Sequence, residues 1–122
     1  MLRPELNVYC VLKERGKYLV LKRKNGIWEF PGGGIEKGES AERACEREAF
    51  EECGLRVHAG RMLCTTSAVF GRKYALYAVY ECRRKGGKPR ISGEHSEMKW
   101  ASLKEMRGMG FGFNARPVLE II

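Results

Sequence analysis

The sequence lacks the features that would place it in several special classes of protein. No apolar run approaches the length that spans a bilayer, and the first ten residues lack the long apolar stretch of a secretory signal. No repeat, low-complexity segment or linker divides the chain. We therefore expect a single domain over residues 1–122, located in the cytoplasm and without a membrane partner.

The cysteines lack the spacing of metal ligands or of a disulfide framework. They are scattered, odd in number and without a Cys-x-x-Cys pair: Cys10, Cys45, Cys53, Cys64 and Cys82. This pattern argues against both a zinc site and a set of disulfides. We expect reduced, mostly buried thiols that pack as small hydrophobic side chains.

The chain does have a globular composition and an excess of positive charge. Hydrophobic residues make up 43% and charged residues 31% of the sequence, and the formal net charge is +8. Such a charge favours anionic partners, for example nucleotide phosphates or RNA, although solvated lysines on any small domain give the same total.

Residue patterns predict a mixed α/β (α+β) fold in which helices flank a mixed sheet. Strands are expected over residues 6–12, 18–21, 28–30, 56–69, 73–82 and 98–101, with a loop over 86–89. The clearest helix covers residues 41–53, with Ser40 as its N-cap and Gly54 after its end. A helical turn over 103–106 and a closing helix over 115–122 complete the prediction.

The predicted helix over residues 41–53 carries carboxylates on the side that should pack. At about 100° per residue, Glu48, Glu51 and Glu52 fall on the same side as the alanines of the helix. The other side carries Arg43, Arg47 and Phe50. Clustered carboxylates repel one another and lose hydration when they are partly buried, which is unfavourable. A hard divalent cation that binds their oxygens offsets both effects. A solvated acidic face with salt bridges to the arginines explains the helix alone equally well.

The segment before the helix decides between these alternatives. Glycines 32–34 free the backbone to approach a ligand, and Glu36 and Glu39 add acid to the same loop. Seven positions match G-x5-E-x7-R-E-U-x-E-E-x-G-U, where U is a bulky apolar residue: Gly33, Glu39, Arg47, Glu48, Glu51, Glu52 and Gly54. This is the Nudix box, so residues 33–55 resemble the Nudix hydrolase family. Ala49 at the first U position departs from the pattern, which weakens one packing contact and leaves the chemistry intact.

The resemblance implies a Nudix-type fold and a hydrolase that uses Mg²⁺ or Mn²⁺ to act on a diphosphate. By position in the box, Glu51 and Glu52 are implied as metal ligands, the Gly32 carbonyl as a further candidate ligand, and Glu48 as a ligand or the general base. These three glutamates are the candidate catalytic residues. The remaining box residues are implied to be structural, with Arg47 and Glu39 pairing to hold the loop against the helix: Gly33, Glu39, Arg47 and Gly54.

Similarity to the MutT-type subgroup continues outside the box. The segment 28–33, Trp-Glu-Phe-Pro-Gly-Gly, resembles the subgroup's entry to the box. Glu94 lies six residues before Trp100, where the subgroup carries an additional metal-ligating glutamate, and Glu97 is a nearby competitor. Arg23 matches a basic residue that contacts substrate, and an exposed arginine at a strand end is an equally good interpretation.

Asn114 has two interpretations. The segment 114–118 resembles the one that supplies a base-reading asparagine in MutT-type enzymes, and an amide can both donate to and accept from a purine. An asparagine before a helix with proline in its first turn is also typical of an N-cap, which we expect here. His58 and His95 lack partners at ligand spacing and are expected to be non-catalytic.

The resemblance favours cleavage of a nucleoside triphosphate, such as a modified or oxidised purine nucleotide, to a monophosphate and pyrophosphate. One alternative is a dinucleotide polyphosphate or a nucleotide sugar such as ADP-ribose, although ADP-ribose members often carry a proline where Gly71 stands here. Another is an RNA 5′ end, because the basic runs over residues 83–85 and 88–90 are expected to form a loop that could contact a phosphate backbone. No RNA-binding motif accompanies those runs, so RNA is not favoured. We expect a monomer or a homodimer.

Overall fold

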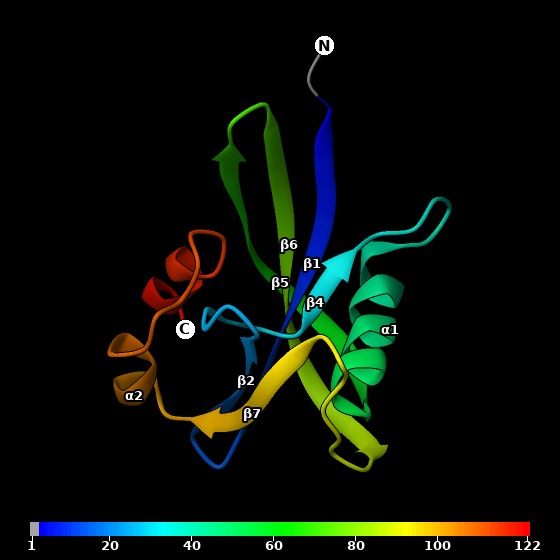
Figure 1. Cartoon of the computed structure of the whole chain (residues 1–122). Helices are drawn as coiled ribbons and strands as arrows, with labels where there is room; N and C mark the ends of the chain where they lie inside the picture. The colour runs from blue at the N-terminus through cyan, green and yellow to red at the C-terminus, as the bar shows by residue number, and fades with distance from the viewer. Residues whose placement is uncertain (1–2) are drawn as a thin grey trace.

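The computed structural model describes residues 3–122, with all of their side chains except that of Phe70. Its strands are β1 (Pro4–Glu14), β2 (Lys17–Arg23), β3 (Trp28–Glu29), β4 (Gly32–Gly34), β5 (Leu55–Phe70), β6 (Lys73–Gly87) and β7 (His95–Ala101). Its helices are α1 (Ala41–Cys53), α2 (Leu103–Arg107) and a final 3₁₀ helix, η1 (Arg116–Glu120). The strands form one mixed sheet in the order β3-β2-β1-β6-β5, in which β4 also pairs with β1 and β7 with β2 (Figure 1).

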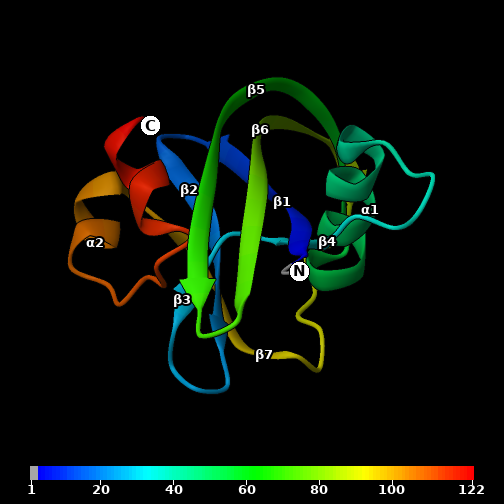
Figure 2. The ribbon, with the colours of Figure 1, turned by 90° about the horizontal axis from the view of Figure 1, so that it is seen from above.

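Strand β1 lies at the centre of this sheet and contributes side chains to the two hydrophobic cores, one on each face of the sheet. Val8, Cys10 and Leu12 pack with the buried face of α1, whereas Tyr9 and Val11 point to the opposite face and pack with residues of α2 and η1. This alternation follows from the two-residue period of a strand. Helix α1 therefore lies on one side of the molecule, and α2 and η1 lie on the other (Figure 2). The predicted fold class is confirmed.

Helix α1 begins and ends where its sequence predicted. The Ser40 hydroxyl accepts a hydrogen bond from the Arg43 N–H, which satisfies one of the free donors of the first turn. Gly54 adopts a left-handed conformation with φ of 73° and donates its N–H to the Phe50 carbonyl. These two local signals fix the helix that carries the box carboxylates.

Several predicted strand boundaries were wrong, because pairing with distant strands extends or divides the elements. Residues 86 and 87 were expected in a loop, but Gly86 and Gly87 pair with Arg56 and Leu55, so β6 continues to Gly87. Strand β7 begins at His95, three residues earlier than expected, through pairing with β2. The predicted strand over residues 28–30 ends at Glu29, and residues 32–34 form β4 against β1.

The predicted closing helix was also wrong. Residues 116–120 form a short 3₁₀ helix, with Pro117 in its first turn. Its N-cap residue is Ala115, and no side chain caps it, so the expected cap role of Asn114 is contradicted. The physical reason is that Asn114 is buried, with its main-chain carbonyl accepting a hydrogen bond from the Thr66 hydroxyl at 2.9 Å.

The prediction that the cysteines are mostly buried is confirmed. All five are free thiols, four are buried and Cys64 is half-buried. Among residues 3–122, no helix is long and apolar enough to cross a membrane.

Candidate active site

Arg47 fastens the glycine-rich loop to helix α1. Its guanidinium donates to both carboxylate oxygens of Glu39, at 2.8 and 2.9 Å, and to the main-chain carbonyl of Gly34 at 2.9 Å. The hydrogen bonds from Arg47, with a further one from the Glu36 N–H, lower the pKa of Glu39 to about 2. The pair therefore stays charged at neutral pH and holds the loop over the first turns of α1.

The three box glutamates on α1 differ in their exposure. Glu52 is buried, with 6% of its surface exposed. The side chain of Glu48 is 14% exposed and that of Glu51 is 55% exposed. The helical wheel had placed Arg47 on the opposite side from these residues, but its guanidinium curls round to contact both Glu48, at 2.9 Å, and Glu51, at 3.3 Å. A long flexible side chain explains that difference from the wheel.

Glu52 is the box carboxylate whose pKa is raised furthest by its surroundings. Its Oε1 accepts the Gly32 N–H at 2.8 Å. Burial raises its pKa to about 8, and repulsion from Glu29, Glu48 and Glu94 adds to that effect against the opposing Gly32 hydrogen bond. Burial also raises the pKa of Glu48, although Arg47 opposes the shift. A bound cation would relieve the conflict in both side chains.

Glu94 lies with the three box glutamates at one end of the site, which we call the acidic end. A cavity of about 280 Å³ is lined by the three glycines, the three box glutamates, Ser92 and Glu94. Glu94 comes from the loop before β7, whereas its competitor Glu97 lies in the β7 ladder opposite Lys22 and does not line this cavity. The fold therefore brings Glu94, and not Glu97, to the box carboxylates.

These residues have the donor chemistry of a site for a hard divalent cation. Every candidate ligand is an oxygen, from Glu48, Glu51, Glu52, Glu94 or the Gly32 main chain, and such donors suit Mg²⁺ or Mn²⁺. Among the side chains of the described chain, no three of these carboxylates bring oxygens within 4.8 Å of one another. Without a cation, the like charges of the carboxylates repel one another and keep them apart. A bound cation would neutralise that repulsion and draw the carboxylates closer together.

A central chamber of about 450 Å³ adjoins the acidic end and contains two residues that sequence reasoning missed. Glu29 accepts a hydrogen bond from Arg23 at 2.7 Å, and its other oxygen lies 2.8 Å from Nε2 of the buried His95. Burial favours a higher pKa for Glu29, but the hydrogen bonds from His95 and Arg23 outweigh it and lower the pKa. Glu29 and His95 are 66 residues apart, so spacing along the chain could not pair them.

A third chamber of about 190 Å³ opens beside the central one and has aromatic walls. Trp28, Tyr9 and Phe113 line it together with Asn114. The Oδ1 atom of Asn114 is buried and has no hydrogen-bond partner among the residues that the structure describes. An unmatched buried acceptor costs folding free energy, so its presence points to a ligand that supplies the missing donor.

Gly33 provides a direct test of how closely the loop approaches the carboxylates. A Cβ atom at this position would lie 2.7 Å from the Glu48 carboxylate. We expect Gly33→Ala to lower kcat by about ten- to a hundredfold, because small misplacements of reacting groups have effects of that size. Stability should change little, because only the end of a flexible side chain must move.

Gly34→Ala is the matched control, since its Cβ would meet only the Asn7 side chain at an ordinary 3.7 Å. Turnover and thermal melts of the two variants are the measurement. Equal turnover in both would show that the position of Glu48 does not matter.

Comparisons with known proteins identify the family of this chain. The chain belongs to the NUDIX domain family, whose model matches residues 1–120, and the family resemblance of its box is thereby confirmed. A MutT-like protein from Streptomyces ambofaciens is 34% identical over 79% of this chain and 62% of its own length. An RNA pyrophosphohydrolase from Baumannia cicadellinicola subsp. Homalodisca coagulata is 40% identical over 73% of this chain and 53% of its own length.

The chain therefore spans less than two thirds of the length of these curated relatives. It matches a solved structure over nearly its full length: the MutT NUDIX hydrolase from Burkholderia pseudomallei superposes with a TM-score of 0.86 and 27% identity, over 98% of each chain.

Proposed function

We propose that this chain is a Mg²⁺- or Mn²⁺-dependent pyrophosphohydrolase that cleaves a nucleoside triphosphate to a nucleoside monophosphate and pyrophosphate. One observation carries the proposal: three neighbouring chambers, named the groove because adjacent chambers share lining residues, lead from the unpartnered Oδ1 of Asn114 to the acidic cluster of α1. The aromatic and central chambers share Tyr9, Arg23 and Glu29. The central and acidic chambers share Gly32, Gly33, Glu52 and Glu94.

The order of chambers along the groove matches the order of groups in a nucleotide. Aromatic walls with one amide suit a flat base. The basic side chain of Arg23 stands in the middle, where a sugar and its first phosphate would lie. The acidic end suits a diphosphate only when cations accompany it, because carboxylates and phosphates repel each other.

The carboxylates at the acidic end would bind the metal and take a proton from the attacking water. Nudix hydrolases generally use a divalent metal, which polarises the phosphates and lowers the pKa of water. Glu51, Glu52 and Glu94 would hold it, with the Gly32 carbonyl as a further ligand. Glu48 would act as a ligand or as the general base that takes a proton from the attacking water. Arg47 limits where Glu48 can point, through its 2.9 Å hydrogen bond.

A screen of four substrate classes with Mg²⁺ tests the proposal. Nucleoside triphosphates, dinucleotide polyphosphates, nucleotide sugars such as ADP-ribose, and 5′-triphosphorylated RNA oligonucleotides would be compared by kcat/KM, with products identified. We expect the highest value for a purine nucleoside triphosphate, released as monophosphate and pyrophosphate. A clear preference for a dinucleotide or a nucleotide sugar would overturn the substrate assignment and leave the diphosphate chemistry in place.

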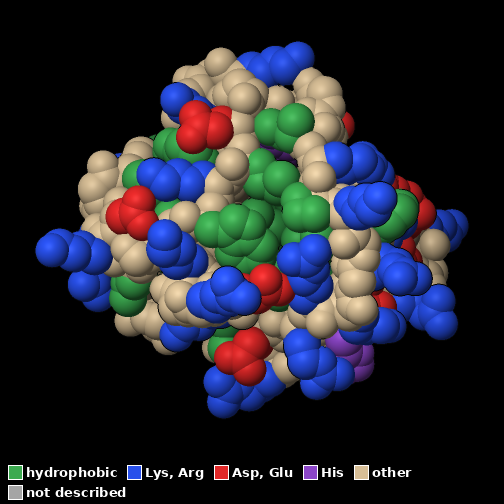
Figure 3. All heavy atoms as spheres, turned by 90° about the horizontal axis from the view of Figure 1, so that it is seen from below, with side chains coloured by type: hydrophobic (Ala, Val, Ile, Leu, Met, Phe, Trp, Pro, Cys, Tyr) green, Lys and Arg blue, Asp and Glu red, His purple; other side chains and the backbone are tan. Residues whose placement is uncertain are grey.

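RNA is the second candidate substrate, and two observations favour it. The Baumannia relative carries the name RNA pyrophosphohydrolase, and Lys and Arg side chains surround an apolar patch on the face seen in Figure 3. The basic run over residues 83–85 lies in β6 and not in the loop that we had expected. Salt separates the candidates, because binding of a strand through several phosphates weakens steeply as salt rises, whereas turnover of a small nucleotide changes far less.

Asn114 gives a specific prediction about the base. Asn114→Asp keeps the shape of the side chain but replaces a donor-acceptor pair by acceptors alone. We expect both this variant and Asn114→Ala to erode the preference among purine triphosphates by about ten- to a hundredfold in kcat/KM, the effect of one unmatched buried hydrogen bond. The thermal melt of Asn114→Ala should fall little, since no cap is lost. Asn114→Asp places a carboxylate in a buried position, so its Tm should fall further as the pH rises and the carboxyl ionises. Unchanged ratios between bases in both variants would remove Asn114 from the substrate site.

A further inference from the structure

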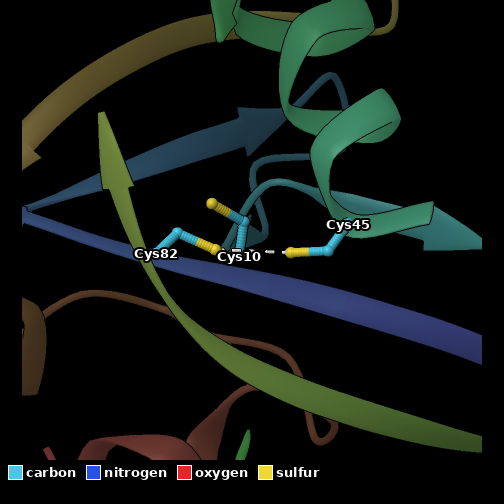
Figure 4. A group of neighbouring side chains, drawn as sticks. All are labelled: Cys10, Cys45 and Cys82. Carbon is cyan, nitrogen blue, oxygen red and sulfur yellow. Dashed lines mark hydrogen bonds between the residues drawn. The ribbon is translucent and has the colours of Figure 1, made fainter. Parts of the chain in front are cut away.

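Three cysteines that are far apart in the sequence meet in the core beneath α1. Cys10 comes from β1, Cys45 from α1 and Cys82 from β6, and their sulfur atoms all lie within 4.8 Å of one another. Figure 4 shows the sulfur atoms of Cys45 and Cys82 facing each other, with Cys10 beside them. The Sγ atoms of Cys45 and Cys82 are 3.5 Å apart. Spacing along the sequence could not predict this cluster, because each sulfur comes from a different element.

We propose that Cys10, Cys45 and Cys82 form a binding site for a soft, thiophilic divalent cation of the Zn²⁺ and Cd²⁺ type. Soft cations prefer sulfur donors, whereas Mg²⁺ and Mn²⁺ prefer oxygen. With metal–sulfur bonds of about 2.3 Å, three sulfurs around one cation lie about 4 Å apart. Because all three sulfur–sulfur distances are within 4.8 Å, none needs to change by more than about 1 Å to reach that geometry. The acidic cluster must contract further.

Binding requires that the thiols lose their protons. The Cys45 thiol donates to the Tyr9 carbonyl at 3.7 Å, and the Cys82 thiol donates to the Tyr80 carbonyl at 3.6 Å. One divalent cation with three thiols gives a tris-thiolate complex of net charge −1 and three released protons. Affinity should therefore rise with pH. Because all three side chains are buried, uptake requires local opening of α1 and should be slow.

The cation would join the helix that carries the box glutamates to the sheet beneath it. Cys45 lies three residues before Glu48, and it packs against β1 and β6 through Cys10 and Cys82. A cation that binds only the folded chain stabilises it by an amount that grows with the logarithm of the free cation concentration above the Kd. The site is separate from the oxygen ligands proposed for Mg²⁺, so its test does not depend on hydrolysis.

The chain offers matched controls for this test. Cys53 is a buried thiol on the same helix and Cys64 a half-buried thiol on β5, and neither belongs to the cluster. The double variant Cys53→Ala/Cys64→Ala leaves only the three proposed ligands. Cys45→Ala and Cys82→Ala each remove one of them.

Reduced, metal-free protein would be titrated with Cd²⁺ and with Zn²⁺, in the presence of excess Mg²⁺. The readouts are thiolate-to-cadmium absorption in the ultraviolet, bound metal per chain, far-UV circular dichroism and the thermal melt. We expect one Cd²⁺ per chain in the wild type and in Cys53→Ala/Cys64→Ala, with unchanged circular dichroism and a rise in Tm of about 5 °C or more. Cys45→Ala and Cys82→Ala should lose the absorption and the rise in Tm.

Three results would overturn the proposal. One is the absence of cadmium absorption in Cys53→Ala/Cys64→Ala. Another is equal absorption in whichever of Cys45→Ala and Cys82→Ala stays folded. The third is absorption that develops only as the circular dichroism of the folded chain is lost, because thiols of an unfolded chain also bind metal.

Discussion

Removal of divalent cations should abolish hydrolysis, and Mg²⁺ or Mn²⁺ should restore it. The physical reason lies in the cluster of Glu48, Glu51, Glu52 and Glu94, which offers a diphosphate only negative charge. Cations neutralise that charge and contribute several kcal/mol to the transition state, so we expect turnover to fall at least about a hundredfold in chelator.

The control is the same chelator already saturated with Mg²⁺, which should not inhibit. Turnover would be followed across a titration of added Mg²⁺, with residual metal measured in each sample. Undiminished hydrolysis in excess chelator, with the metal content verified as low, would contradict the assignment.

Glu52→Gln should lower kcat by about a hundredfold or more while leaving the fold intact. Loss of a key charged group in a preorganised site has effects of this size. The substituted amide oxygen can still accept the Gly32 N–H, which Glu52 accepts at 2.8 Å, so the local shape is kept. Glu46→Gln is the matched control, because Glu46 lies on the same helix and binds the Ala59 N–H outside the groove. Near-normal turnover in Glu52→Gln would exclude Glu52 as a metal ligand.

The same variant gives a pH-dependent change in stability. Burial raises the pKa of Glu52 from an ordinary 4.5 to about 8. Below pH 4.5 this carboxyl is protonated in both the folded and the unfolded chain and adds no pH-dependent term. Between pH 4.5 and 8 the unfolded chain releases the proton first, so the folded state of the metal-free protein loses stability as the pH rises.

Gln cannot titrate, so the Tm of metal-free Glu52→Gln should exceed that of the wild type by an amount that grows from pH 5 to pH 8. Addition of Mg²⁺ should narrow the gap by stabilising the wild-type carboxylate. A gap that is constant across this range would show that Glu52 is ionised normally in the folded chain.

Elements set by local signals could be predicted from the sequence, and elements set by distant pairing could not. Helix α1 was located correctly because Ser40 and Gly54 act on the adjacent turns of the same segment. The end of β6 was missed because it depends on β5, which begins 32 residues before Gly87 along the chain. Gly87 pairs there with φ of 93°, a conformation in which strand propensities give no guidance.

The residues of the candidate site also fall into those that a local sequence pattern predicted and those that only strand pairing brings together. The box glutamates, Arg47 and Glu39 lie in one continuous segment, so their pattern indicated the acidic end of the groove. Glu29 and His95 meet only through the pairing of β2 with β3 and β7. The cap interpretation of Asn114 was wrong, because the local sequence pattern of a cap is the same whether the side chain caps the helix or lines a chamber.

The central claim is that this chain, with a divalent cation, cleaves a nucleoside triphosphate between its α- and β-phosphates. Phosphorus NMR of the purified chain with a purine nucleoside triphosphate and Mg²⁺ tests it most directly, with Glu52→Gln as the inactive control. The account predicts equal amounts of nucleoside monophosphate and pyrophosphate, formed by the wild type and not by the variant. Release of orthophosphate and nucleoside diphosphate, or equal product from Glu52→Gln, would contradict it.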